Sequence, residues 1–150
     1  MKPLRIYADT SVIGGCFDEE FRTESNALIQ LFHNHKAQLL LSDLIMIELE
    51  RAPDRIQKVI TDLPDNVIEI LNQSDESRRL RDQYMTEKIV GKSQTNDAHH
   101  VAIATVANAD MIVSWNFKHL VHYDKIRGFN AINLREGYKP LSIYSPLEVI

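Results

Sequence analysis

The sequence lacks the features that would place it in a membrane or outside the cell. It has one cysteine, Cys16, so no internal disulfide can form, and we expect a buried free thiol in a reducing environment. No hydrophobic run approaches the length of a membrane span, and the opening residues are too mixed for a secretory signal. We therefore expect a cytoplasmic protein with no membrane contact.

A surplus of positive charge is also lacking. The chain carries 17 Lys and Arg residues against 21 Asp and Glu residues, which gives a net charge of −4 with histidine neutral. A protein that binds nucleic acid over its whole surface is expected to be basic. If this chain acts on a polyanion, it must do so through a local basic patch or through metal ions held by acidic side chains.

The composition that is present suits a soluble globular protein. With 150 residues, of which 44% are hydrophobic and 25% charged, we expect a single domain over residues 1–150. Predicted strands cover residues 4–8, 38–41, 66–71, 111–113 and 129–134, with an extended piece at 143–146. Predicted helices cover residues 23–35, 43–51, 54–63, 74–90 and 97–109. This alternation favours an α/β fold with a mostly parallel sheet and helices on both faces.

Polar side chains occur where several of these strands end. In an open parallel sheet, ligands bind beyond the carboxyl ends of the strands. Asp9 and Asn116 lie at such ends. Asp97 begins a predicted helix, which Thr95 or Asn96 would cap, and Glu48 lies two turns into another. We therefore expect these four polar groups to converge at one edge of the sheet. Asp110 is excluded because it precedes its strand.

Clustered carboxylates indicate a cation, because like charges repel one another unless something positive lies among them. Hard oxygen ligands suit Mg²⁺ or Mn²⁺ rather than zinc. An ion held by Asp9, Glu48 and Asp97 would lower the pKa of a bound water and neutralise charge on a phosphate. That is the chemistry of a phosphodiester hydrolase, and it would let an acidic protein act on a polyanion.

Motifs around the same residues resemble those of the PIN-domain family, and within it the VapC-type toxins. They are Tyr7-Ala8-Asp9-Thr10-Ser11, Ile47-Glu48-Leu49, Asn96-Asp97-Ala98, Ala109-Asp110-Met111-Ile112-Val113-Ser114-Trp115-Asn116-Phe117 and the terminal Ile143-Tyr144-Ser145-Pro146-Leu147-Glu148. The resemblance implies a PIN-like three-layer α/β/α sandwich and an Mg²⁺- or Mn²⁺-dependent endoribonuclease. It also implies the toxin of a toxin–antitoxin pair, a cytoplasmic homodimer that acts on RNA and is inhibited by a small antitoxin.

The resemblance assigns roles residue by residue. Asp9, Glu48 and Asp97 match the family's acidic metal ligands. The fourth acidic position falls on Asn116, whose amide oxygen can coordinate a metal or orient a water but adds no charge. Ser11 and Ser114 are expected to support the site. Because of Asn116, a catalytically weak PIN-like scaffold that binds RNA or a protein partner is the alternative.

Other readings of single residues stay open. Asp9 fits a turn after a strand, Asp97 fits a favourable charge in a helix's first turn, and Glu48 among apolar neighbours needs a partner. A receiver-type phosphoacceptor domain fits less well, because it would need an acidic pair directly after the first strand. His100, one helical turn from Asp97, could contact Asp97 or substrate, but a surface or half-buried histidine is the favoured interpretation.

Aromatic and basic residues near the site have two interpretations each. Trp115 and Phe117 could stack on an unpaired base, although aromatic residues of this kind more often close the core beneath a loop. The basic stretch around residues 78–88 is interpreted as a solvated helix face. Lys92 and Lys118 are better placed to meet a phosphate.

Overall fold

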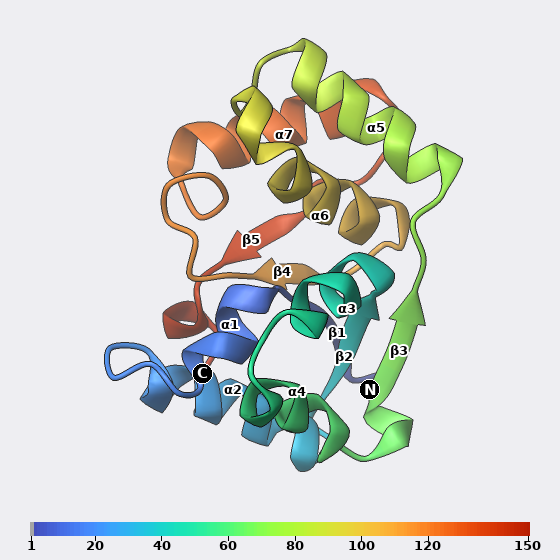
Figure 1. Ribbon diagram of the computed structural model, residues 1–150. Coiled ribbons are helices and arrows are strands. Elements are labelled where there is room, and N and C mark those ends of the chain that lie inside the picture. Colours follow the sequence, from blue (N-terminus) through green and yellow to red (C-terminus); the bar gives the residue numbers. More distant parts are fainter. Residues whose placement is uncertain (1) are drawn as a thin grey trace.

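The computed structural model describes residues 2–150, and in them it forms one five-stranded, wholly parallel sheet (Figure 1). The strands are β1 (Leu4–Ala8), β2 (Ala37–Ser42), β3 (Ile68–Leu71), β4 (Met111–Val113) and β5 (Ser142–Tyr144), in the order β3-β2-β1-β4-β5. The central strand is β1, in which Tyr7 pairs with Leu40 of β2 and with Ile112 of β4. Parallel strands need crossover connections, and helices fill them.

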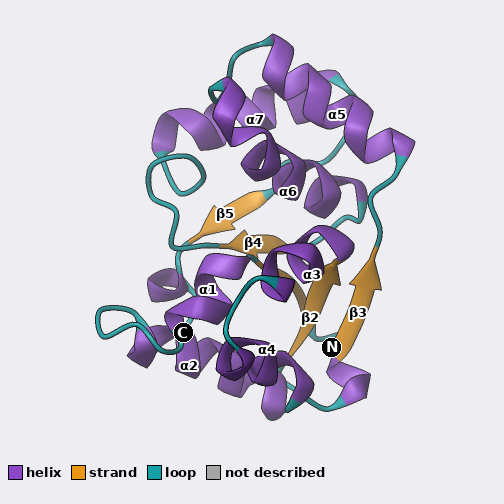
Figure 2. Cartoon of the chain, in the orientation of Figure 1, coloured by secondary structure: helices purple, strands orange, loops and turns teal. Residues whose placement is uncertain are grey.

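Helices cover both faces of the sheet, as predicted (Figure 2). They are α1 (Thr10–Gly15), α2 (Arg22–His33), α3 (Asp43–Glu50), α4 (Asp54–Thr61), α5 (Asp75–Thr86), α6 (Thr95–Val106) and α7 (Tyr123–Arg135), with short 3-10 turns η1 (Asp65–Val67), η2 (Lys92–Gln94) and η3 (Pro146–Glu148). Figure 1 shows α5, α6 and α7 on one side and α1, α2 and α4 on the other. The three-layer α/β/α sandwich is confirmed.

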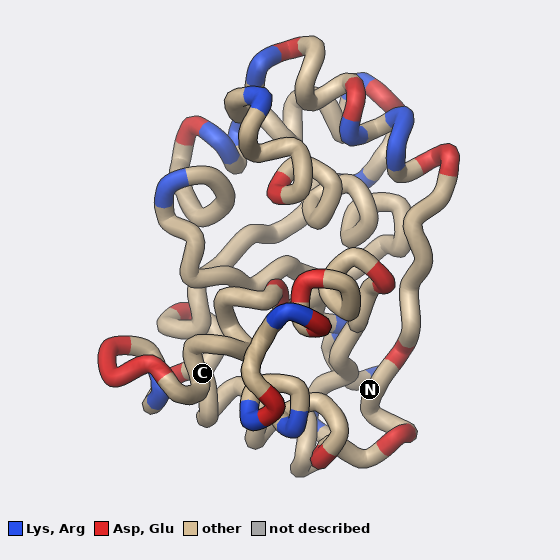
Figure 3. The backbone as a smooth tube through the Cα atoms, viewed as in Figure 1, with Lys and Arg blue, Asp and Glu red and all other residues tan. Residues whose placement is uncertain are grey.

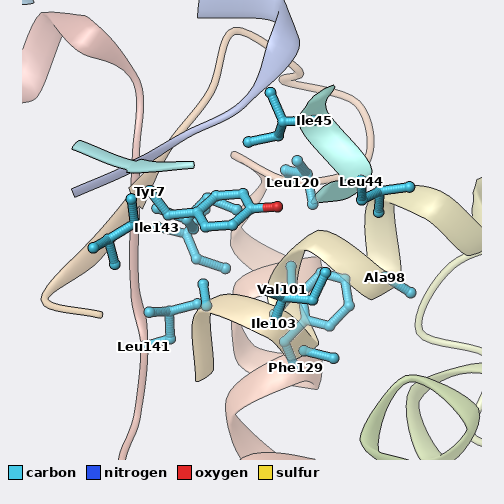
Figure 4. Packing of buried hydrophobic residues seen from close by; sticks show 14 of the residues in the cluster. Tyr7, Leu44, Ile45, Ala98, Val101, Ile103, Leu120, Phe129, Leu141 and Ile143 are labelled. Atoms are coloured by element: carbon cyan, nitrogen blue, oxygen red, sulfur yellow. The ribbon is translucent and has the colours of Figure 1, made fainter. Parts of the chain in front are cut away.

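Two apolar clusters fill the space between the layers. Because side chains alternate along a strand, Tyr7 points toward α6 and α7, whereas Ile6 and Ala8 point toward α1 and α2. Figure 4 shows the Tyr7 ring packed in the first cluster, with its hydroxyl oxygen directed away from Ile143 and toward α3. Cys16 is a buried free thiol in the second cluster, as expected.

The predicted strand at residues 129–134 is wrong, because this segment belongs to α7. Phe129 and Ile132 lie three residues apart on the buried face of that helix, while Leu134 is exposed. Six residues were too few to separate a strand's alternation from a helical period. The last strand is β5 instead. No helix between residues 2 and 150 is both long and apolar enough to cross a bilayer.

Gly14 and Gly15 both lie inside α1. A Cβ atom on Gly15 would lie 2.6 Å from Ser25 Oγ and 3.0 Å from Trp115 Nε1. Gly15 is therefore needed for close packing of α1 against α2 and the loop after β4. It does not mark a turn.

Candidate active site

Asp9 follows β1 and caps α1, and it is almost fully buried at 6% exposure. Its Oδ1 accepts hydrogen bonds from Ser11 Oγ at 2.6 Å and from the Val12 amide at 3.4 Å. Its Oδ2 accepts one from Ser114 Oγ at 2.6 Å. Burial raises the pKa of Asp9, and the bonds from the two serines and the charge of His100 oppose that rise. The carboxylate is thus held in one orientation with a lone pair of Oδ2 still open.

Ser11 and Ser114 connect Asp9 to the loop after β4. Ser11 Oγ accepts a hydrogen bond from the Trp115 amide at 3.0 Å, and Ser114 Oγ accepts one from the Asn116 amide at 2.9 Å. Each hydroxyl therefore donates a hydrogen bond to Asp9 and accepts one from a backbone amide. The two residues expected to support the site both contact Asp9.

Glu48 leans from α3 toward the same edge and is half-buried. Its Oε1 accepts hydrogen bonds from Thr10 Oγ1 at 2.7 Å and from His100 Nε2 at 2.9 Å. Burial acts to raise the pKa of Glu48, but the hydrogen bond and charge of His100, together with Thr10, outweigh it and lower that pKa. Both bonds go to Oε1, so within residues 2–150 no hydrogen bond occupies Oε2. The partner that Glu48 needed is His100.

His100 is buried, at 3% exposure, and the prediction of a surface or half-buried histidine is wrong. Its Nδ1 lies 2.5 Å from Tyr7 Oη, and Tyr7 Oη lies 2.7 Å from Ser42 Oγ. Ser42 in turn accepts a bond from the Ile45 amide at the start of α3. Burial raises the pKa of Tyr7 well above its usual value, so its hydroxyl keeps its proton. A chain of hydrogen bonds from Ser42 through Tyr7 and His100 to Glu48 gives every member a partner.

The sequence did not predict this series of hydrogen bonds, although Tyr7 gave one indication of it. A tyrosine on the inward face of a central strand needs a buried hydrogen-bond partner for its hydroxyl. The sequence does not say which residue supplies that partner, because Tyr7 and His100 are 93 positions apart.

Asp97 lies in the first turn of α6 and is half-buried. Burial raises its pKa, the charges of His100 and His119 lower it, and the charges of Asp9 and Glu48 raise it further. The three predicted acidic residues are therefore near enough for the charges of Asp9 and Glu48 to shift the pKa of Asp97. Within residues 2–150 no hydrogen bond reaches the Asp97 carboxylate, which leaves both of its oxygens open.

The predicted caps of α6 are wrong. Gln94 is the capping residue, without a side-chain bond, and Thr95 already belongs to the helix. The Thr95 hydroxyl donates to the Lys92 carbonyl at 2.8 Å instead. That bond ties η2 to the first turn of α6.

Asn116 lies beside the acidic residues but uses its side chain locally. Its Oδ1 accepts a hydrogen bond from the His119 amide at 2.9 Å, which closes the turn after β4. One lone pair of the amide oxygen remains for a ligand. As predicted, Asp110 precedes β4 and lies at the opposite edge of the sheet. There its Oδ2 accepts a hydrogen bond from the Arg5 amide at 2.7 Å.

The aromatic and basic residues near the site differ in how far they are buried. Trp115 is buried, stacks on Phe21 at 4.3 Å between ring centroids and donates its indole N–H to Ser25, so it closes the core. Phe117 remains exposed. On α5, arginines pair with neighbouring aspartates at the surface, in keeping with a solvated helix face.

The donor set suits a magnesium ion, although the side chains do not form a closed cage. Within residues 2–150 no three His, Cys, Asp or Glu side chains are grouped so as to hold a metal ion. Mg²⁺ commonly binds through one or two carboxylates and keeps several waters. Asp97, Glu48 Oε2 and Asp9 Oδ2 offer open carboxylate oxygens of this kind, so the residues fit such an ion.

The comparisons with known proteins agree with this architecture. A family model described as PIN domain matches residues 5–118. A chain of the VapBC2 complex from Rickettsia felis, solved bound to a promoter DNA fragment, is 15% identical, with 95% of this chain and 98% of that chain covered and a TM-score of 0.60. VapBC from Salmonella typhimurium, also bound to DNA, is 16% identical, with 95% and 98% covered and a TM-score of 0.57.

A third similar structure is described as a toxin that cleaves the sarcin-ricin loop. This protein, VapC20 from Mycobacterium tuberculosis, is 12% identical, with 91% of this chain and 98% of that chain covered and a TM-score of 0.52. At such identities these structures show a shared fold. No curated protein sequence matches the chain.

Proposed function

The chain belongs to the PIN domain family, and from that membership we propose that it is a metal-dependent endoribonuclease that acts as the toxin of a toxin–antitoxin pair. The observation that carries the proposal is the gathering of Asp9, Glu48 and Asp97 at one edge of the sheet. The charges of two of these acids raise the pKa of the third, and open oxygens remain on each. Such repulsion is relieved when a cation binds.

Each residue has a defined task in this proposal. Asp9, Glu48 and Asp97 would hold Mg²⁺ or Mn²⁺, which supplies charge neutralisation at the scissile phosphate and activates water. Ser11 and Ser114 fix the orientation of Asp9. His100 fixes Glu48 through Oε1 and leaves Oε2 for the ion. One of the carboxylates accepts the proton of the attacking water.

The partners in this proposal are RNA, a small antitoxin and a second copy of the chain. Support for the antitoxin comes from the VapBC complexes among the similar structures. A cytoplasmic location follows from the proposed RNA substrate.

The decisive experiment is RNA cleavage by the parent chain and by Asp9→Asn, with and without EDTA. The Asn side chain keeps the size of Asp but loses the charge, so we expect cleavage to fall by about a hundredfold or more. Asp62→Asn, at an exposed aspartate that ends α4, is the matched control. If Asp9→Asn cuts RNA as well as the parent, the assignment is wrong.

A catalytically weak scaffold that binds RNA or a protein is the second candidate, and Asn116 favours it. The neutral amide lowers the negative charge of the site, and its oxygen already accepts the His119 amide. Calorimetric titration with Mn²⁺ separates the two candidates. A nuclease must bind the ion, whereas a scaffold has no need of it.

A further inference from the structure

A hollow of about 470 Å³ lies where the end of α5, the loop before α6 and the start of α7 meet. Three lysines line it: Lys88, Lys92 and Lys125. The floor between them includes the apolar side chains of Met85 and Val90. Figure 3 shows that Lys and Arg (blue) occur both on the loop from α5 to α6 and on the first turn of α7. A chain of net negative charge therefore gathers cations around one apolar pocket.

These lysines have no carboxylate partners. Throughout residues 2–150 the ion pairs use arginine or His100 as the cation, and none uses a lysine. Glu87 is next to Lys88 in sequence but pairs with Arg135 at 3.2 Å. No acidic residue lines the hollow. The three lysine ammonium groups, which take part in no ion pair, are therefore available to an anion.

The lysines can bind a phosphate. A lysine ammonium group is a point charge, and proteins commonly use it to bind phosphate oxygens. The pocket has lysines and no arginine among its lining residues. An apolar floor next to phosphate-binding groups suits a nucleotide, which has an anionic backbone and a base with apolar faces.

The pocket is also close to the acidic site. Lys92 opens η2, which runs directly into α6, and Asp97 lies in the first turn of that helix. Five residues of 3-10 and α-helical rise separate the two by roughly 9 Å. The bond from Thr95 to the Lys92 carbonyl holds this segment together.

We propose that this lysine pocket binds a nucleotide of single-stranded RNA next to the one that is cleaved. Lys88, Lys92 and Lys125 contact its phosphates, and the apolar lining at Met85 contacts its base. The inference rests on the proposed nuclease function and adds a place for the substrate on the protein. It assigns RNA binding to a local basic patch, which is one of the two routes by which an acidic protein can act on a polyanion.

The test measures the binding of a fluorescent single-stranded RNA of about 12 nucleotides by anisotropy. All variants carry Asp9→Asn, so that the RNA stays intact. In the pocket variant, Lys88, Lys92 and Lys125 are each changed to Gln. The control variant changes the exposed Lys36, Lys58 and Lys139 to Gln, which gives the same change in net charge.

We expect the pocket variant to bind RNA roughly tenfold more weakly and the control to bind almost as well as the parent. The slope of log K against log salt should fall by about 2, because each phosphate contact to a single strand contributes about 0.7. Lys88→Gly should reproduce a third of this slope change. Since Lys88 has φ +57°, which glycine adopts freely, folding is not at risk in that variant.

The outcomes separate the pocket from the nuclease assignment. If the Asp9→Asn parent binds no RNA, the proposed function itself fails. If that parent binds RNA and the pocket variant binds it equally well with the same salt slope, the pocket proposal is overturned. It is also overturned if polyglutamate displaces the RNA from the parent and loses its affinity for the pocket variant, because the pocket would then serve an acidic protein.

Discussion

His100 Nε2 lies 2.9 Å from Glu48 Oε1, and this contact joins α6 to α3 at the carboxyl edge of the sheet. The ring's other nitrogen contacts Tyr7 in the central strand, so the orientation of Glu48 depends on a side chain of β1. An ionised carboxylate only accepts, so Nε2 must donate to Glu48. The position of a predicted metal ligand is thereby coupled to the core.

Tyr7→Phe tests that coupling. Removing the hydroxyl leaves His100 Nδ1 and Ser42 Oγ without their partner in a buried place, which should cost about 1–3 kcal/mol of unfolding free energy. RNA cleavage should fall as well, because Glu48 loses its fixed orientation. Urea unfolding and a cleavage assay measure the two effects. Tyr144→Phe, at a partly exposed tyrosine, is the control and should change neither.

Asp97→Asn should abolish cleavage and yet stabilise the metal-free chain. Burial and the charges of Asp9 and Glu48 raise the pKa of Asp97, so its charged form at neutral pH opposes folding. Removing the charge should add a few tenths to about 1 kcal/mol, after allowing for solvent screening. Thermal unfolding without metal measures this, and a loss of stability would contradict it.

Manganese should reverse that order of stability. A ligand at about a hundredfold excess over its Kd stabilises the folded state by about 2.7 kcal/mol. We expect the parent to gain stability as Mn²⁺ is added and Asp97→Asn to gain much less. Equal gains in the two proteins would place the ion elsewhere.

Stability should fall in mild acid because of His99. Burial, and then the charges of Arg81, His100 and Arg78, lower the pKa of His99 to about 4. As the pH falls from about 6.5 toward 4, the unfolded chain binds a proton that the folded chain refuses, so unfolding becomes easier by up to about 3 kcal/mol. His99→Gln should flatten this part of the stability profile. His122→Gln, at an exposed histidine, should leave it unchanged.

Alanine substitutions at the two adjacent glycines of α1 should change the free energy of unfolding in opposite directions. In Gly15→Ala the new methyl group would lie 2.6 Å from Ser25 Oγ, and we expect a loss of about 1–3 kcal/mol. In Gly14→Ala the nearest atom is 4.0 Å away, and the helix gains up to about 1 kcal/mol from the better helix former. Urea unfolding of the two variants measures the difference, and equal stabilities would contradict it.

Asn116→Asp should strengthen metal binding. The new carboxylate can still accept the His119 amide, so the turn after β4 is kept while a negative charge is added near Asp9. We expect Mn²⁺ to bind about tenfold more tightly, equivalent to about 1.4 kcal/mol. Calorimetric titration tests this, and an unchanged affinity would show that the residue lies outside the ion's reach.

Much of the fold was predictable because it depends on local pattern. Short apolar runs alternating with amphipathic stretches indicated a parallel sheet with helices on both faces, and the polar residues after those runs indicated the edge that carries Asp9. The segment at 129–134 failed because its pattern was short and fits both periods. Whether Gly15 breaks or continues a helix depended on Ser25 and Trp115, which are distant in sequence.

By itself, the sequence determined the alternation of strands and helices from α2 to β4 and the family motifs around Asp9, Glu48 and Asp97, since both follow from residues close together in the chain. Only the tertiary structure decided that His100 is buried between Tyr7 and Glu48, that Asn116 closes a turn, and that three lysines surround one hollow. These facts depend on which distant side chains meet. Tertiary packing decides those contacts, and the local hydrophobic pattern of the sequence does not indicate them.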